Sequence, residues 1–470
     1  MQVYNTLTKQ KEEFVPLHTG KVGMYVCGPT VYDYIHIGNI RAYVFADTLR
    51  RVFEDIGYEV RMIKNITDVG HLTADDIAQG DSGEDKVAKK AAKEHKTPDE
   101  IARFYEDYAL RTEQAVGIEP AHYFPRATAH ITQMIKLIEE LIAKGHAYEK
   151  NGNVFLDVTT FPVYGKLSGN TLANLEVGAR LEEHPDKKNP WDFALWLKAP
   201  DGHLMHWPSP WSEGYPGWHI ECSAMSMEYL GDTFDIHTGG EDNIFPHHEA
   251  EIVQSEGVTG KPFVKYWLHT RHMMVDGTKM SKSKGNFYTL EDIIERGYTP
   301  MDFRMLINSA HYRSQMNFTW EALEQAKKNK EALFALVERL STLSSETNAP
   351  DGFDGAIELV GIRSIMQDDL NTPQALALTL ELSKKINALL DKKESVQISA
   401  LQSVLENIFF LFGLTQENIS IPQDIEEFAK ARDLAREHKD WAESDRLRDL
   451  ITAAGYKVED TARGHRLKKL

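Results

Sequence analysis

Cysteine is scarce in this sequence and long apolar runs are missing, and each scarcity excludes a class of protein. Only two of the 470 residues are cysteines, Cys27 and Cys222, so the disulfide framework of a small secreted domain is excluded. No stretch approaches the roughly 20 consecutive apolar residues that a membrane helix needs. The first residues carry charges where a signal peptide is apolar. We therefore expect a cytoplasmic protein without a membrane segment, whose two cysteines serve metal binding, catalysis or core packing.

Basic residues are also in deficit. The chain has 53 Lys and Arg against 71 Asp and Glu, a formal net charge of −18. This charge excludes a protein that coats nucleic acid indiscriminately, although a local basic track is enough to bind a specific nucleic acid. With 42% hydrophobic and 26% charged residues, the chain is neither disordered nor collagen-like. Its length allows two to four domains with cores of their own.

Residues 20–66 have the pattern of one βαβ unit. Alternating apolar residues predict a strand over 22–26 and another strand near 60–66. Between them, apolar residues at helical spacing predict a helix over 40–56, with Asn39 as its N-cap. A strand, a helix and a strand of this length favour a parallel sheet with a right-handed crossover.

Changes in composition predict an α/β protein in which a Rossmann-like domain with a parallel sheet is split by an insertion and followed by an all-α region. The inserted part is rich in Pro, Gly and Trp, and the glycines thin out after about residue 320. The predicted parts are 1–115, the first half of the parallel-sheet domain; 116–215, the inserted module; 216–310, its second half; 311–415, a helical bundle; and 416–470, a helical hairpin with a basic tail.

The segment His36-Ile37-Gly38-Asn39 lies between the first predicted strand and its helix. Backbone N–H groups at the start of a helix attract phosphate, and glycine permits close approach of a ligand. An imidazole can donate a hydrogen bond to developing charge. A surface loop with an incidental histidine is the alternative.

Two further segments carry candidate chemistry. Lys279 and Lys282 lie three residues apart within 277–286, among glycines and small hydroxyl residues. Such a cationic loop can close over a triphosphate, and an ordinary solvated loop is the alternative. His247 and Glu251 lie four residues apart after a proline, which places them on one helical face. That spacing suits either a shared metal ion or an ion pair.

Taken together, these segments resemble the cysteinyl-tRNA synthetases, a family of class I aminoacyl-tRNA synthetases. The likeness runs from Tyr4 to the last helical hairpin. The turn at 36–38 resembles the HIGH region of the family, and 279–283 spells its KMSKS loop without change. Residues 217–225 and 235–242 match further blocks. The order and separation of four such blocks make the resemblance specific.

The resemblance implies a catalytic parallel-sheet domain, an anticodon-binding helical region and a two-step reaction. L-cysteine would be activated with ATP to cysteinyl-adenylate and then transferred to the 3′ end of tRNA(Cys). The family's single Zn²⁺ would fall on Cys27, Cys222, His247 and Glu251. Zinc binds a thiolate readily and a serine hydroxyl poorly, so no editing domain is expected. Mg²⁺ is expected with ATP, and the enzyme is expected to be a monomer.

The resemblance assigns the remaining site residues to three groups. Those for ATP binding and catalysis are His36, Gly38, Asn39, Gly239, Gly240, Asp242, Lys279 and Lys282; those for the cysteine pocket are Thr67, Trp218 and His237; those for the anticodon are Arg436, Trp441, Asp445 and Asp460. Trp218 and His237 can instead be core residues, the glycine pair a simple turn, and Trp441 a pin between two helices. Residues 456–470 supply a basic track for RNA.

The sequence departs from the family pattern at two places. Asn39 stands where the HIGH motif has histidine, and asparagine cannot carry a positive charge. An additional stretch over 69–83 contains His71, Asp75, Asp76 and Asp81 and is either a solvated loop or a lid near the acceptor end of the tRNA.

Two other functions compete with the proposed reaction. A related enzyme joins cysteine to an amino sugar through the same adenylate, but it has no evident use for the C-terminal helical hairpin. A non-catalytic RNA-binding relative would keep the fold, but the unbroken run at 279–283 favours an active enzyme.

Overall fold

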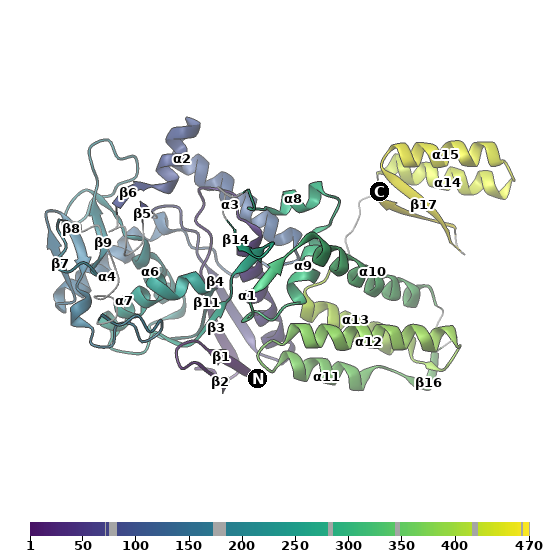
Figure 1. The fold of residues 1–470 in the computed structure, drawn as a ribbon, viewed down its shortest axis with the longest axis horizontal. Helices are drawn as coiled ribbons and strands as arrows, with labels where there is room; N and C mark the ends of the chain where they lie inside the picture. The colour runs from purple at the N-terminus through teal and green to yellow at the C-terminus, as the bar shows by residue number, and fades with distance from the viewer. Residues whose placement is uncertain are drawn as a thin grey trace. The chain divides into compact units, whose positions relative to one another are not determined.

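The computed structural model of this chain divides it into two compact units, Met1–Thr415 and Gln416–Leu470 (Figure 1). The residues that the structure describes are 1–70, 72–74, 82–172, 185–280, 285–343, 348–415, 422–461 and 464–469.

A four-stranded parallel sheet is the centre of the first unit. In spatial order its strands are β12 (Val264–Thr270), β11 (Phe234–Gly240), β3 (Lys21–Val26) and β4 (Glu59–Lys64). Helix α1 (Ile37–Asp55) connects β3 to β4, which confirms the predicted βαβ unit. Because β11 and β12 come from the second half of the domain, the prediction of one sheet split by an insertion is also confirmed.

The start of α1 differs from the prediction. The helix begins at Ile37, and its N-cap is His36, not Asn39. The His36 side chain accepts the N–H groups of Gly38 and Asn39, while the Asn39 side-chain oxygen accepts the N–H of His36. The prediction was wrong because it favoured the residue type that most often caps helices, whereas an imidazole nitrogen here fills the same role.

The chain between β4 and β11 first extends the parallel sheet and then forms a module of its own. Residues 122–127 run beside β4, with isolated bridges from Tyr123 to Ile63 and from Arg126 to Ile66. The module is an antiparallel sheet accompanied by a helix; its elements are β7 (Ala147–Lys150), β8 (Asn153–Leu156), β9 (Phe193–Lys198), β10 (Gly214–Pro216) and α4 (Ile131–Ala143).

Two helices and a short ribbon precede this module. The ribbon pairs β5 (Leu72–Ala74) with β6 (Ser82–Asp85), and α2 (Lys86–Glu94) and α3 (Pro98–Ala115) follow. The additional stretch noted in the sequence thus contributes the two strands of the ribbon. Its residues His71, Asp75, Asp76 and Asp81 lie outside the described residues.

The remainder of the first unit is mostly helical, as the loss of glycine after residue 320 predicted. Its helices are α8 (Leu290–Glu295), α9 (Pro300–Asn308), α10 (Trp320–Thr342), α11 (Ala356–Met366), α12 (Thr372–Asp391) and α13 (Ile398–Phe412). A small sheet is formed by β14 (Thr278–Lys279), β13 (Met273–Val275) and β15 (Met316–Phe318); β13 and β14 follow the parallel sheet in the sequence, and β15 lies between α9 and α10. None of the helices described is both long and apolar enough to cross a bilayer.

A buried ion-pair network joins α1 to the helical bundle. Arg304 on α9 pairs with Asp47 on α1 at 2.5 Å and donates to the Phe412 carbonyl at the end of α13. Arg51 pairs with the same carboxylate at 2.8 Å. Burial alone would raise the pKa of Asp47, but the two guanidinium groups hold it below its ordinary value. The helix that begins beside His36 is therefore fixed to the bundle by charge as well as by apolar packing.

The second unit is a helical hairpin with a β-ribbon. Helices α14 (Gln423–Glu437) and α15 (Trp441–Ala453) are followed by antiparallel strands β17 (Tyr456–Thr461) and β18 (Gly464–Lys469). The hairpin was predicted, but the ribbon was not, because the tail was interpreted by its basic charge alone. Its strands alternate buried and charged residues, and the buried ones complete a small core with Ile425, Ala429 and Ile451 of the helices.

Candidate active site

The carboxyl ends of the parallel strands surround one cavity of about 310 Å³. In open parallel sheets, ligands bind in the crevice at this edge. The predicted site residues that line the cavity are Cys27, His36, Gly38, Asn39, Thr67, Trp218, Gly240, Asp242 and Lys279. The two halves of the split domain therefore contribute to a single site.

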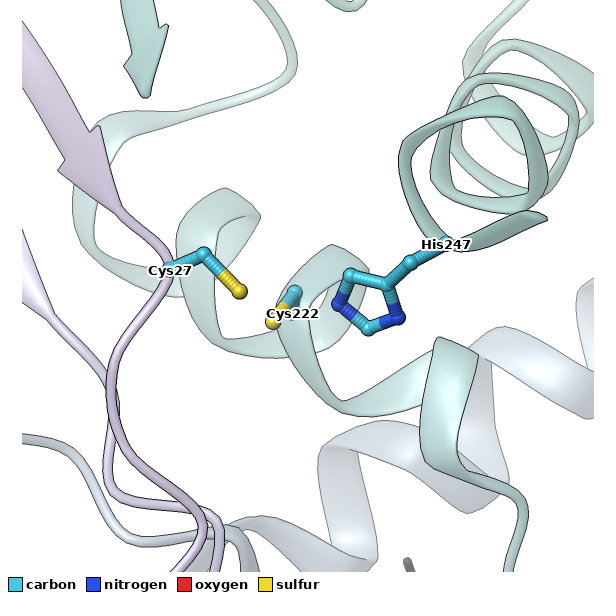
Figure 2. Close-up of side chains that lie close together, drawn as sticks. All are labelled: Cys27, Cys222 and His247. Atoms are coloured by element: carbon cyan, nitrogen blue, oxygen red, sulfur yellow. The ribbon is translucent and has the colours of Figure 1, made fainter. Parts of the chain in front are cut away.

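Cys27, Cys222 and His247 come together beside this cavity. Cys27 directly follows β3, Cys222 lies on α6 (Trp218–Leu230), and His247 lies in the turn before α7 (Glu249–Thr259). One ligand atom of each lies within 4.8 Å of the others, and both thiols are free. Figure 2 shows the two sulfur atoms and the imidazole turned toward one another. Two thiols and an imidazole are a donor set that suits tetrahedral zinc.

Glu251 lies one helical turn after His247, as the four-residue spacing predicted. Its Oε1 is 3.1 Å from Nε2 of His247, and its Oε2 is 2.8 Å from Nε2 of His237. Together with His237 and His248, this fully buried carboxylate forms a second group of ligand-type atoms within 4.8 Å. The structure thus brings Glu251 next to one of the three Cys and His residues, and its role as a fourth metal ligand stays a prediction.

Burial shifts the pKa values of several groups in and around this cluster toward their uncharged forms. The hydrogen bond with Cys27 and burial raise the pKa of the Cys222 thiol well above its ordinary value. Burial also raises the pKa of Glu251, lowers that of His248 and lowers that of His269 to about 3. Neutral imidazoles keep the lone pairs that bind metals, and a bound cation removes the proton from a coordinating thiol. The donor set therefore fits a thiophilic cation.

Trp218 and His237 occupy different places, although both were assigned to the cysteine pocket. Trp218 lines the cavity, and its ring stacks on the imidazole of His247 with centroids 4.4 Å apart. His237 is fully buried, stacks on Trp267 and does not line the cavity. Its Nε2 lies 2.8 Å from Oε2 of Glu251, so His237 contacts one of the predicted metal ligands directly.

Thr67 lines the cavity at the end of a hydrogen-bonded chain that the sequence did not reveal. Asn65 Nδ2 donates to Thr67 Oγ1 at 3.0 Å, and the Thr67 hydroxyl donates to Glu221 Oε2 at 3.0 Å. Asn65 Oδ1 in turn accepts the N–H of Gly28. Glu221 is fully buried beside Cys222. The sequence offered one signal for this chain of hydrogen bonds. Glu221 is an acidic residue inside an apolar segment, and a buried carboxylate needs hydrogen-bond donors.

The hydrogen bonds of His36 define its tautomer. Its Nδ1 accepts the N–H groups of Gly38 and Asn39 at 3.0 and 3.3 Å, so a neutral ring carries its proton on Nε2. The first N–H of the helix, from Ile37, donates to the Tyr288 carbonyl. These N–H groups are thus already bonded within the protein, and contact with a phosphate at this turn falls to side chains.

The loop after β14 packs directly against the same turn. A Cβ atom on Gly38 would lie 2.8 Å from the terminal carbon of Met280, so glycine permits this close approach. Lys279 is exposed on the cavity wall. Lys282 lies outside the described residues, so its predicted contact with ATP has no position in the structure.

Gly239 and Gly240 are the last residues of β11 and not a simple turn. Cβ atoms there would lie 2.7 Å from the His248 ring and 2.4 Å from Asp242 Oδ1, respectively. The two glycines therefore allow a buried histidine and an exposed carboxylate to pack against the end of the strand. Asp242 and Gly240 line the cavity, whereas Gly239 does not.

Three of the four predicted anticodon residues lie together in the second unit. Arg436 pairs with Asp460 at 3.2 Å, and its guanidinium lies 5.8 Å from the centre of the Trp441 ring. The fourth, Asp445, is one turn along α15 from Trp441 and pairs with Arg448 at 3.2 Å. Arg432, which the sequence did not single out, holds Asp460 from the buried side at 2.7 Å.

This fold and this site define the catalytic domain of a class I tRNA synthetase. The sequence matches the family of tRNA synthetases class I (C) catalytic domains over residues 13–328 and the DALR domain over 362–416. The structure resembles Mycobacterium tuberculosis methionyl-tRNA synthetase bound by methionyl-adenylate, with a TM-score of 0.60 and 14% identity, covering 83% of this chain and 89% of that one. At this identity the likeness concerns the fold.

The sequence relatives are more specific. A cysteine–tRNA ligase of Chlorobaculum tepidum is 43% identical over 484 residues, covering 99% of this chain and 98% of the relative. A cysteine–tRNA ligase of Thermus thermophilus is 42% identical over 479 residues, with the same coverage of 99% and 98%. The chain belongs to the cysteine–tRNA ligase family.

Proposed function

We propose that this chain activates L-cysteine with ATP to cysteinyl-adenylate and transfers the cysteinyl group to the 3′ end of tRNA(Cys). One observation carries this proposal. The only two cysteines of the chain, which are distant in sequence, meet His247 beside a cavity that is also lined by His36 and Lys279. A site with a soft donor set and a basic wall suits a substrate with a thiol at one end and a triphosphate at the other.

Selection of cysteine is proposed to depend on one Zn²⁺ ion per chain, held by Cys27, Cys222, His247 and Glu251. When bound, the ion would act as a Lewis acid that binds the thiolate of the substrate strongly and a serine hydroxyl weakly. Trp218, stacked on His247, limits the room beside this position. A site that bonds a distinguishing group can reject a close analogue strongly enough to make editing unnecessary.

The amine of the substrate is proposed to bind at Thr67 and Asp242. The Thr67 hydroxyl accepts from Asn65 and donates to Glu221, so one acceptor lone pair remains for an ammonium group. Asp242 adds a carboxylate on the same cavity wall. This arrangement directs the carboxylate of the amino acid toward the α-phosphorus of ATP.

Activation requires stabilisation of charge that develops on the phosphate oxygens. The substrate carboxylate attacks the α-phosphorus, and pyrophosphate leaves. His36 donates through Nε2, and Lys279 and Lys282 neutralise the phosphates, with Mg²⁺ bound to ATP. Gly38, Asn39, Gly239 and Gly240 shape the turn and the strand end that hold these side chains. Positioning and electrostatics of this kind account for much of phosphoryl-transfer catalysis.

Transfer to tRNA uses both units of the chain. A terminal ribose hydroxyl attacks the adenylate carbonyl, and AMP leaves. We propose that Arg436, Trp441, Asp445 and Asp460 bind the anticodon, because arginine and aspartate pair with base edges and an exposed indole stacks on an unpaired base. In this account 1–115 and 216–310 are the catalytic domain, 116–215 is the connective module, and 311–415 and 416–470 serve tRNA binding in a cytoplasmic monomer.

The test is aminoacylation by the purified full chain with zinc, ATP, cysteine and total tRNA, scored by which tRNA becomes charged. We expect charging of tRNA(Cys) alone, together with cysteine-dependent exchange between ATP and pyrophosphate. Lys279→Ala should abolish most of the exchange, whereas the exposed Lys384→Ala is the matched control. Exchange without charging, in a reaction that consumes an amino sugar, would instead identify the related cysteine ligase.

A further inference from the structure

Two exposed aromatic rings lie next to each other outside the cavity. Tyr34 and Phe104 are 43% and 45% exposed, and their ring centroids are 6.3 Å apart with the planes at 74°. Tyr34 also meets the rings of Tyr105 and Tyr108 edge-on, at 5.1 and 4.7 Å. We call Tyr34, Phe104 and Tyr105 the aromatic platform. The ring of Tyr105 contacts those of Tyr34 and Phe104, and Tyr108 also contacts Tyr34. These contacts fix the orientation of Tyr34 and Phe104, although both rings are partly exposed to solvent.

Two lysines, one on α2 and one just after it, lie beside this platform. Residues 86–96 contain five lysines and one glutamate, in a chain whose net charge is −18. Lys96 Nζ lies 5.5 Å from the centre of the Phe104 ring, and Lys90 Nζ lies 5.3 Å from that of Tyr105. Glu94 pairs with both of these lysines, and Asp33 lies 3.9 Å from Lys90. Lys93 is exposed on α2 and adds positive charge that these acidic residues do not neutralise in full.

The platform adjoins the reaction cavity. Tyr34 is two residues before His36, which lines the cavity and meets Phe287 edge-on at 5.1 Å. Behind Tyr34, the Tyr108 hydroxyl donates to Glu291 at the start of α8. A ligand on the platform would therefore lie beside the turn whose His36 lines the cavity.

We infer that the aromatic platform binds the unpaired nucleotides at the 3′ end of tRNA and guides them into the cavity. This inference rests on the proposed function and names a subsite for its second substrate. A duplex keeps its bases stacked on one another, so exposed ring faces suit only unstacked bases. Lysines beside the rings neutralise the phosphates between those bases. Stacking on aromatic side chains tolerates any base, as a shared 3′ end requires.

The test compares Phe104→Ala with Phe104→Trp, which keeps an aromatic plane. With the full chain, we expect Phe104→Ala to leave cysteine-dependent exchange between ATP and pyrophosphate unchanged and to slow transfer from the preformed adenylate to tRNA by about 10-fold, within the range for one stacked base. Phe104→Trp should restore transfer to within about 2-fold of the wild type. Val15→Ala, an exposed apolar side chain outside the helical regions proposed to bind tRNA, is the matched control and should change neither step.

A second measurement separates stacking from a structural role. Acceptor-stem hairpins with a 3′ overhang, with an abasic overhang or with a blunt end are used as inhibitors of charging. The wild type should prefer the hairpin with the intact overhang, and Phe104→Ala should lose that preference. The loss of affinity caused by Phe104→Ala and the loss caused by removing the overhang bases should therefore not be additive. Equal weakening of all three hairpins, or transfer at the wild-type rate, would overturn the inference. Absence of cysteine-dependent exchange in the wild type would instead contradict the proposed function.

Lys93→Ala tests the charge of the subsite. We expect a smaller loss of transfer, about 3-fold, and a weaker dependence of tRNA affinity on salt, because one phosphate contact is removed. Lys21→Ala, at the first residue of β3, is the matched exposed lysine outside the regions proposed to bind tRNA and should leave the salt dependence unchanged. An unchanged salt dependence in Lys93→Ala would contradict the assignment of α2 to this ligand.

Discussion

The residues proposed to bind the metal in the first unit and those proposed to bind the anticodon in the second unit differ in burial. In the first unit, Cys222 and His247 are each 1% exposed and Glu251 is fully buried. In the second unit, Trp441 is 57% exposed and Asp460 is paired from two sides at the surface. Distinguishing a thiol from a hydroxyl requires a site without water, where one bond dominates. Recognition of a large RNA allows exposed groups that each contribute little.

The largest effect is expected at the buried site that is proposed to select cysteine. Cys222→Ser should lower zinc content and reduce the preference for cysteine over serine by about 1,000-fold or more, because a site that bonds a distinguishing group gives 10⁴- to 10⁵-fold discrimination. Zinc content by atomic absorption and exchange with each amino acid measure this. Ser226→Ala, a buried hydroxyl on the same helix, is the control. A variant with full zinc content and unchanged discrimination would contradict the proposal that Cys222 binds a zinc ion that selects cysteine.

The next effect concerns stability in the buried network of α1 and the bundle. Arg304→Met should lower the free energy of unfolding of the first unit by about 3 kcal/mol, because it leaves the buried Asp47 carboxylate with one guanidinium partner. Urea denaturation measures this loss. Arg448→Met, which removes an exposed partner of Asp445, should cost less than about 1 kcal/mol.

The pH dependence of the same network has a definite sign. Since the pKa of Asp47 is held below its ordinary value in the folded state, its ion pairs stabilise the protein above the pKa of the unfolded chain, about 4. This contribution is lost as the pH falls through the lower, folded pKa. Arg304→Met should therefore show a smaller loss of stability below pH 4 than the wild type does. An equal loss in both proteins would contradict the role of Asp47.

A moderate effect is expected at the exposed indole of the second unit. Trp441→Ala should weaken charging of tRNA about 10-fold through one lost stacking contact and leave exchange between ATP and pyrophosphate unchanged. The denaturation midpoint should also stay the same, because more than half of the side chain is already in solvent. Equal losses in charging and exchange would indicate a folding defect and would make Trp441 a structural pin between the two helices.

Much of the catalytic unit followed from local patterns. The alternation over 22–26 and the helical spacing after Ile40 predicted β3 and α1, since both elements bury one face in the core. The spacing of His247 and Glu251 placed them within 3.1 Å, because helix geometry alone fixes that approach. The meeting of Cys27 with Cys222 followed only from family resemblance, since residues so distant in sequence are joined by sheet topology.

The failures have physical reasons of the same kind. Asn39 was predicted to cap α1, but His36 does so, since its imidazole nitrogen accepts the N–H groups of Gly38 and Asn39. The chain from Asn65 through Thr67 to Glu221 joins residues from two halves of the domain, so no local pattern contains it. Sequence reasoning therefore predicted the elements of the split sheet, while the hydrogen bonds that orient the side chains around the cavity could be seen only in the structure.

The smallest effect, and the sharpest contrast with the buried site, is expected for Asp460→Asn. The hydrogen bond with Arg432 outweighs burial and holds the pKa of Asp460 below its ordinary value, so the carboxylate is ionised at neutral pH. Its loss should lower stability by less than about 1 kcal/mol, because the group is half exposed. Charging should change less than 5-fold while preference among anticodon variants of the tRNA relaxes, because an amide still reaches the base but no longer accepts through two oxygens. If the preference among anticodon variants is preserved, the role of Asp460 is only to hold Arg432 and Arg436 in place.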